Sequence, residues 1–68
     1  MWGSQIEEQY GLTPREGEVA LLLVAGLGNA AIASALGVSP HTARHHTQHV
    51  LEKLGVHSRA EAGTCLRR

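Results

Sequence analysis

The sequence predicts an all-α domain of four helices, and three observations lead to this fold class. Apolar residues recur at helical spacing, residues that cap helix N-termini precede the apolar segments, and glycines follow them. The 68 residues have the length of one small domain. Hydrophobic residues make up 43% of the chain, yet Trp2 and Tyr10 are its only aromatic residues, so Ala, Leu and Val must fill the core. Such small core residues suit helices that pack closely together.

Residues 1–11 show no sustained apolar period, so we expect an arm or linker there. Residues 1–4 are expected to include residues added for expression, and the chain is expected to be one module of a larger protein. The domain itself is expected to cover residues 12–68. Its first helix should begin after Thr13, because Thr13-Pro14-Arg15-Glu16 has the spacing of a capping box with proline at the first helical position. The predicted inward stripe of this helix is Val19, Leu22 and Leu23, and its predicted end is Gly26.

A second, shorter helix is expected over residues 30–36, with Asn29 as its cap and Gly37 as its end. The turn Gly37-Val38-Ser39 would lead into a third helix over residues 40–54, which Ser39 would cap and Gly55 would end. A helix, a tight turn and a longer helix form the helix-turn-helix pattern, in which the second helix enters the DNA major groove.

The third predicted helix has two chemically different faces. At 100° per residue its inward stripe consists of Ala43, Thr47, Val50 and Leu54. The opposite arc carries polar side chains, namely His41, Arg44, His45, Gln48 and Glu52, and the shoulder between the faces carries Thr42, His46, His49 and Lys53. A helix roughly 22 Å long is slim enough for the major groove, where Arg and Gln can pair with base edges. An ordinary solvated face is the alternative interpretation.

A fourth helix should begin near Ser58, because Ser58-Arg59-Ala60-Glu61 repeats the capping-box spacing, and should run towards Leu66. Its apolar residues are small. They suit docking on the core, on a second copy of the chain, or on both.

The net charge of the chain is zero but is unevenly distributed. Residues 1–37 carry one arginine against four glutamates, a net charge of −3, and residues 38–68 carry five Lys and Arg residues against two glutamates, a net charge of +3. All five histidines also lie in the second half, and unperturbed histidines take up protons below about pH 6.5. The second half is therefore electropositive and fits a polyanionic partner such as double-stranded DNA.

Other classes of function find little support in the sequence. Cys65 is the only cysteine, so neither an internal disulfide nor a cysteine-based zinc site is expected. His41, His45 and His49 are spaced four residues apart, as in helical Zn²⁺ or Ni²⁺ chelators, but the Glu of a His-Glu-x-x-His hydrolase is missing. We therefore predict no enzyme, no cofactor and no metal site, while incidental metal binding by these histidines stays open. Because neither a membrane span nor a signal peptide is recognisable, we expect a cytoplasmic protein.

Four stretches of the chain carry a more specific pattern. They are Leu12-Thr13-Pro14-Arg15-Glu16-x-Glu18-Val19, Gly26-Leu27-x-Asn29-x-x-Ile32-Ala33-x-x-Leu36-Gly37-Val38-Ser39, Thr42-x-Arg44-x-His46, and Lys53-Leu54-Gly55-Val56-x-Ser58-Arg59-x-Glu61-Ala62. In this order and without gaps, residues 12–62 resemble the LuxR-type, also called GerE-type, helix-turn-helix domain. The resemblance implies a C-terminal DNA-binding domain of a bacterial transcription regulator. It also implies a homodimer and an N-terminal receiver or ligand-sensing domain.

Carried over position by position, the resemblance implies three groups of site residues. Those expected at DNA bases are Arg44, His45 and Gln48. Those expected at the phosphate backbone are Thr42, His46, His49 and Lys53. In the family the last helix carries the dimer contact, which here falls on Ser58, Arg59, Glu61, Ala62, Cys65 and Leu66.

The chain departs from the family pattern at three positions. Ala30 and Ala31 stand where the family usually has a basic residue followed by Glu, and Gly17 stands where a basic residue is frequent. Fewer cations release fewer counterions, so we expect modest non-specific affinity and a shallow salt dependence. The neutral overall charge leaves a second interpretation open, a helix-turn-helix interaction or dimerisation module that does not bind DNA.

Overall fold

The computed structural model describes the backbone of residues 2–66 and the side chains of residues 5–66. Met1, Arg67 and Arg68 lie outside the described residues, and with them the outer ends of the predicted segments 1–11 and 12–68. The described residues form five helices and no strand: α1 (Trp2–Tyr10), α2 (Pro14–Val24), α3 (Asn29–Leu36), α4 (Pro40–Leu54) and α5 (Arg59–Leu66). The all-α fold class is confirmed, with one more helix than the sequence predicted.

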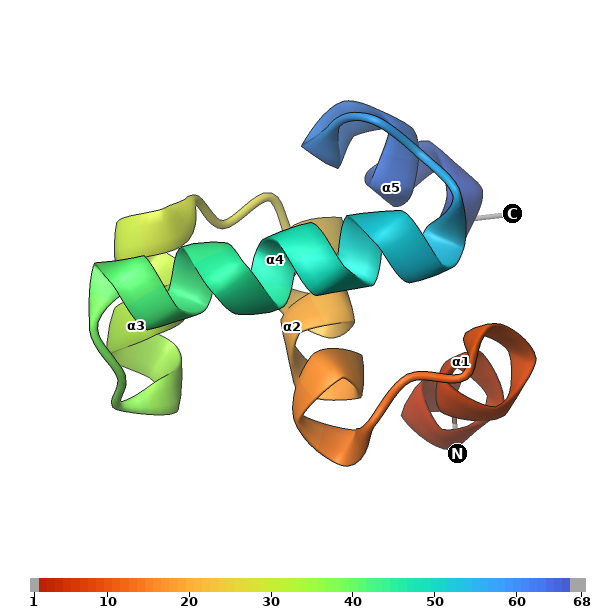
Figure 1. Cartoon of the computed structure of the whole chain (residues 1–68), viewed down its shortest axis with the longest axis horizontal. Helices are drawn as coiled ribbons and strands as arrows, with labels where there is room; N and C mark the ends of the chain where they lie inside the picture. The colour runs from red at the N-terminus through yellow and green to blue at the C-terminus, as the bar shows by residue number, and fades with distance from the viewer. Residues whose placement is uncertain (1, 67–68) are drawn as a thin grey trace.

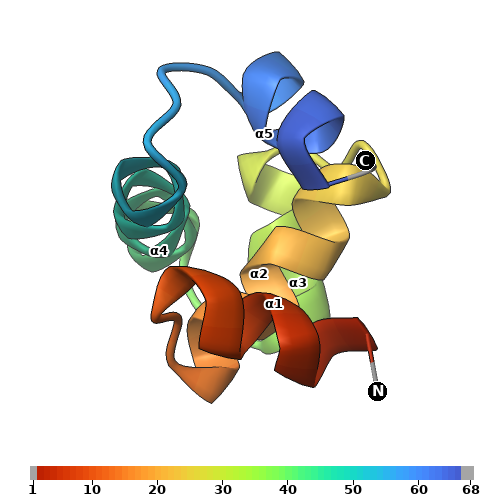
Figure 2. The ribbon, with the colours of Figure 1, turned by 90° about the vertical axis from the view of Figure 1, so that its right-hand side faces the viewer.

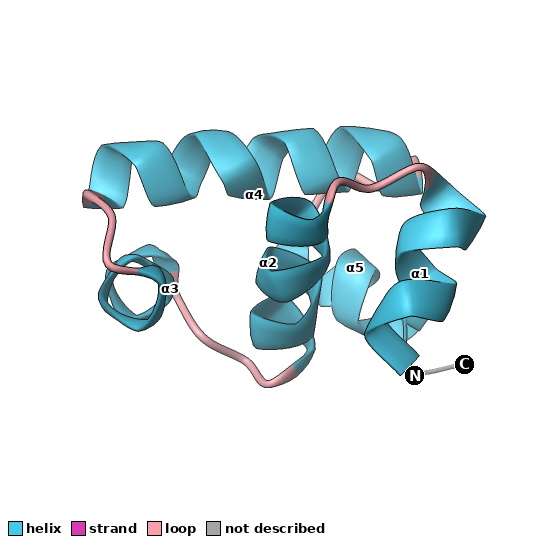
Figure 3. Cartoon of the chain, turned by 90° about the horizontal axis from the view of Figure 1, so that it is seen from below, coloured by secondary structure: helices cyan, strands magenta, loops and turns pink. Residues whose placement is uncertain are grey.

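The longest helix, α4, crosses the middle of the view in Figure 1 and lies along one side of the molecule in Figure 3. Seen from below in Figure 3, α3 lies at one end of α4, α2 near its middle, and α1 and α5 towards its other end. Helix α2 packs against α1, α4 and α5, and α3 packs against α4. Figure 2 looks along α4 and shows the other helices on one side of it. One long face of α4 is therefore left uncovered.

The helix ends follow from local sequence signals. At α2, the Glu16 N–H donates to Thr13 Oγ1 and the Thr13 N–H donates to Glu16 Oε1, which completes the predicted capping box. At α4, Ser39 Oγ accepts from the Thr42 N–H as predicted. Helices α3 and α4 both end at a glycine with positive φ, Gly37 and Gly55, a conformation that other residues rarely adopt.

One predicted cap is wrong. The N-cap of α3 is Gly28, with no side-chain capping bond, and Asn29 is the first helical residue. The side chain of Asn29 is not free to cap, because its Oδ1 accepts a hydrogen bond from Arg59 of α5. The hydrogen bond from Arg59 thus takes the place of the predicted capping bond of Asn29.

The core gathers one face of every helix. Its buried hydrophobic residues are Ile6, Leu12, Val19, Ala20, Leu23, Ile32, Ala33, Ala43, Val50, Leu54, Ala62 and Leu66. Four of the twelve are alanines, so the helices approach closely, as the composition indicated. Of the predicted inward residues on α2, Val19 and Leu23 are buried, whereas Leu22 is half-buried at the margin.

The segment before residue 12 was expected to be an arm or linker, and its residues 2–10 form α1 and pack on α2. Ile6 is 6% exposed and belongs to the core. Gly17 of α2 makes room for the Glu7 side chain of this helix: a Cβ atom there would lie 2.6 Å from Glu7 Oε2 and 2.7 Å from Glu7 Cγ. Among the described side chains of α1, those in the apolar core are Ile6 and Tyr10, four residues apart, so the apolar pattern in the sequence is short.

We expect Ile6→Ala to lower the free energy of unfolding by about 2–5 kcal/mol, because it leaves a cavity between α1 and α2. The control is Gln5→Ala, an exposed neighbour on the same helix, which should change stability by less than about 0.5 kcal/mol. Urea unfolding followed by far-UV circular dichroism measures both. If the two variants were equally stable, residues 2–10 would be an arm that does not contribute to the core.

Candidate nucleic-acid interface

The inward face of α4 is held by apolar packing. All four residues of the predicted stripe are buried, namely Ala43, Thr47, Val50 and Leu54. The one polar member, Thr47, donates its hydroxyl to the Ala43 carbonyl at 2.9 Å, so burial leaves no polar atom without a partner. This packing fixes which side of α4 turns outward.

The outward face carries the residues predicted to contact bases. Arg44, His45 and Gln48 are all exposed, as are His41 and Glu52 on the same arc. Among the described residues, the polar atoms of Arg44 and Gln48 have no hydrogen-bond or ion-pair partner. These side chains are therefore available to an external partner along the uncovered side of α4 (Figure 3).

The predicted phosphate-contacting residues fall into two pairs. Thr42 and His46 are half-buried near the α3 end of α4, and the Thr42 hydroxyl accepts from Ser39 Oγ at 3.0 Å. His49 and Lys53, one and two turns further on, are exposed but lie beside Glu16 of α2. The second pair is thus engaged with the protein itself.

Glu16 brings α2, α4 and the α1–α2 turn together. Its carboxylate is 8% exposed and accepts from Lys53 Nζ at 2.7 Å, while His49 Nδ1 lies 3.9 Å from its other oxygen. Lys53 Nζ also donates to the Gly11 carbonyl at 3.1 Å. Sequence analysis assigned Glu16 to the capping box alone, because a contact across 37 residues has no local signature.

The hydrogen bonds and the charge around Glu16 together have a larger effect on its pKa than its burial does. Burial alone would raise the pKa of this carboxyl, but hydrogen bonds from Lys53 and from Thr13, together with the Lys53 charge, lower the pKa below its ordinary value of 4.5. Glu16 is therefore ionised at neutral pH and holds the Lys53 ammonium. Lys53 was predicted to contact phosphate, and here its charge is balanced inside the molecule.

The remaining cations are mostly paired as well. Arg15 lies 3.5 Å from Glu18, and Arg59 donates to the Leu27 carbonyl and to Asn29 Oδ1. Of the Lys and Arg residues between positions 2 and 66, Arg44 alone has no partner. It lies on the exposed face of α4, where its charge can attract an anionic ligand.

Helix α5 does not offer the full dimer surface that the family resemblance implied. Ala62 is fully buried and Leu66 is 5% exposed, so both pack into their own core and are not available to a second copy. Arg59 is engaged with Leu27 and Asn29. The small residues of α5 pack on α2 of the same chain, and the dimer role of these three residues stays a prediction.

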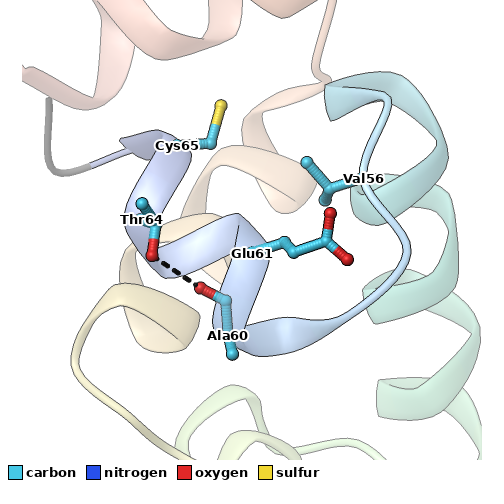
Figure 4. A pocket seen from close by; sticks show the side chains of 5 residues that line it. All are labelled: Val56, Ala60, Glu61, Thr64 and Cys65. Carbon is cyan, nitrogen blue, oxygen red and sulfur yellow. Dashed lines mark hydrogen bonds between the residues drawn. The ribbon is translucent and has the colours of Figure 1, made fainter.

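The exposed side of α5 retains the other predicted residues. Ser58 Oγ accepts from the Glu61 N–H at 3.2 Å and begins the helix, while Cys65 Sγ lies 3.4 Å from the Tyr10 hydroxyl. Figure 4 shows Glu61 and Val56 beside an open hollow of about 450 Å³, whose other lining residues are Ala60, Thr64 and Cys65. A contact with a second copy, if formed here, would use this hollow and its rim.

The predicted absence of a metal site is not tested by the structure, which carries no ions. Among residues 5–66 no three His, Cys, Asp or Glu side chains come together as a metal site would require. The rings of His41 and His45 do meet, with their centres 4.7 Å apart.

Comparison with known proteins adds the family. The family model described as "Bacterial regulatory proteins, luxR family" matches residues 10–66. A putative HTH-type transcriptional regulator of Aeromonas salmonicida is 50% identical over 50 residues, which cover 74% of this chain and 26% of that protein. A putative HTH-type transcriptional regulator of Mycobacterium tuberculosis is 45% identical over 60 residues, covering 88% of this chain and 6% of that protein. The nitrate/nitrite response regulator NarL of Escherichia coli is 41% identical over 51 residues, covering 75% of this chain and 24% of NarL.

The chain thus spans about a quarter or less of the length of these curated relatives. No solved structure gave a significant match. None of the helices formed by the described residues has both the length and the apolar character needed to cross a membrane.

We expect Glu16→Gln to lower the free energy of unfolding by about 1–3 kcal/mol at pH 7, because it removes the charge that pairs with Lys53 while an amide oxygen still caps α2. The pKa of Glu16 is lowered on folding, so its contribution is complete above its ordinary value of 4.5 and is lost as pH falls through the folded value. The difference in free energy of unfolding between wild type and variant should therefore shrink at acidic pH. Urea unfolding at several pH values between 3 and 7 measures the gap.

The matched control is Glu18→Gln, which removes an exposed carboxylate paired with Arg15 on the same helix. It should cost less than about 0.5 kcal/mol at any of these pH values. A gap for Glu16→Gln that is the same at pH 3 and pH 7 would contradict the role of the ionised carboxylate.

Proposed function

The chain belongs to the luxR family of bacterial regulatory proteins, and we propose that it binds double-stranded DNA in a sequence-specific way with α4 in the major groove. The family supports the broader statement of DNA-binding regulation of transcription. The observation that carries the finer one is the exposed set on α4, in which Arg44 and Gln48 have no partner among the described residues. Arg44, His45 and Gln48 project from a helix whose opposite side is locked into the core.

The proposed contacts follow from the chemistry of these side chains. The Arg44 guanidinium matches the two acceptors of guanine, and the Gln48 amide matches the donor and acceptor of adenine. His45 stands beside them on the same arc and would meet a neighbouring base. Thr42, His46 and His49 on the shoulder would then lie nearest the phosphates, with Lys53 acting mainly through Glu16 to hold α4 in place.

Two further statements belong to this proposal. Relatives several times longer than the matched segment, among them a response regulator, support a longer regulator acting in the bacterial cytoplasm, with a receiver or ligand-sensing domain N-terminal to this chain. A homodimer on two half-sites is supported by the free side of α5, where Glu61 and Cys65 border the hollow in Figure 4. We propose no catalytic role.

The alternative, an interaction module that does not bind DNA, requires apolar anchors on the outward face of α4. The exposed residues there are polar, and among the described residues the large hydrophobic side chain left exposed is Leu21 on α2, at 39%. The surface chemistry of α4 therefore favours nucleic acid.

Arg44→Ala and Gln48→Ala should each cost about 1–3 kcal/mol in binding to the cognate site, with relaxed preference at one or two base positions. Selection from a randomised duplex pool, followed by fluorescence anisotropy on the recovered site and on random duplex, measures this. An equal loss on both duplexes would exclude base contacts. Folded protein that binds no duplex even at low salt would favour the interaction module.

A further inference from the structure

The histidines at the start of α4 form a pair, His41 and His45, of which the DNA proposal uses only His45. The His41 and His45 rings lie one helical turn apart, with centres 4.7 Å apart and planes inclined at 68°. Both side chains are exposed, so rotation of the rings is not blocked by packing. We propose that these two rings bind one divalent transition-metal ion between them.

The separation of the rings suits this role. A metal–nitrogen bond is about 2.0–2.1 Å long, so each ring centre would lie about 3.2 Å from a bound ion. Two ring centres separated by 4.7 Å would then subtend an angle of roughly 95° at the ion. This angle is close to that between neighbouring ligands in square-planar or octahedral coordination, which Cu²⁺ and Ni²⁺ adopt, and smaller than the tetrahedral angle of Zn²⁺ sites.

The other histidines of α4 are less suitable. His49 is four residues from His45, but its Nδ1 lies 3.9 Å from the Glu16 carboxylate, on the side of α4 that faces α2. His46 is half-buried. Since no third His, Cys, Asp or Glu joins the pair among the described residues, water would complete the coordination.

Two effects oppose a cation at this place. The N-terminus of α4 carries the positive end of the helix dipole, and the exposed Arg44 lies on the same arc. At an exposed helix end, the dipole term lowers affinity by less than about tenfold. The second imidazole binds intramolecularly and raises the affinity for the metal ion by on the order of 100-fold over a single histidine. This gain exceeds the loss caused by the helix dipole.

Occupation of the pair has one consequence, which rests on the proposed function. A ring nitrogen of His45 that holds a metal ion cannot also contact a base. The ion should therefore weaken binding to the selected DNA site, and this effect should require His41 although His41 is not among the residues proposed to contact DNA.

The test is calorimetric titration of the untagged protein with NiCl₂ at pH 7.5, without DNA. Wild type should bind one ion per chain. His41→Gln and His45→Gln should each lower the affinity by on the order of 100-fold, because a single imidazole remains. The controls are His49→Gln, which removes the alternative partner of His45, and His57→Gln, and both should bind as wild type does.

Each outcome decides the proposal. No binding by wild type, binding unchanged in His41→Gln, or binding lost in His49→Gln would overturn the site. In a second step, anisotropy with the selected duplex should show weaker binding in the presence of Ni²⁺ for wild type but not for His41→Gln. Ni²⁺ binding without any change in DNA affinity supports the site and overturns the coupling, whereas failure to bind DNA without metal refutes the proposed function alone.

Discussion

The buried carboxylate of Glu16 is the interaction on which the geometry of the domain depends. One of its oxygens caps α2 through the Thr13 N–H and also accepts from Lys53 of α4, and the other faces His49. A buried charge is tolerated only when its partners replace water, so the last turn of α4 must stay close to the first turn of α2. The Ser39 cap and the Ala43 to Leu54 stripe fix the rest of α4. The outward arc is thus set by contacts on the opposite side.

Sequence patterns predicted the local structure well and the tertiary contacts poorly. The bounds of α4, its four buried residues and its exposed arc were predicted, because caps and a helical apolar period act within a few residues. The contact of Glu16 with Lys53 and both contacts of Arg59 join residues thirty or more positions apart, and no spacing rule indicates them. The position of α5 was equally hard to predict. Small residues such as Ala62 can pack against a partner or in the core of their own chain, and in the structure Ala62 is buried where α5 packs on α2.

Helix α1 shows how one small residue changes the surface of the domain. Gly17 leaves space on α2 that the Glu7 side chain fills, and a larger residue there would displace it. The family resemblance implied a frequent cation at this position. In its place the chain has a glutamate from a neighbouring helix, which lowers the positive potential on this part of α2.

The distribution of cations has a consequence for how such a domain could bind DNA. Lys53, Arg15 and Arg59 are each balanced or bonded within the chain, which leaves Arg44 as the free permanent cation of residues 2–66. With so little free fixed charge on residues 2–66, counterion release by these residues can supply only a small share of affinity. Direct contacts to bases must then contribute more than in a strongly basic domain. When attraction to the phosphates is weak, specific binding depends on the few side chains on the outward face of α4, whose orientation is fixed by the core.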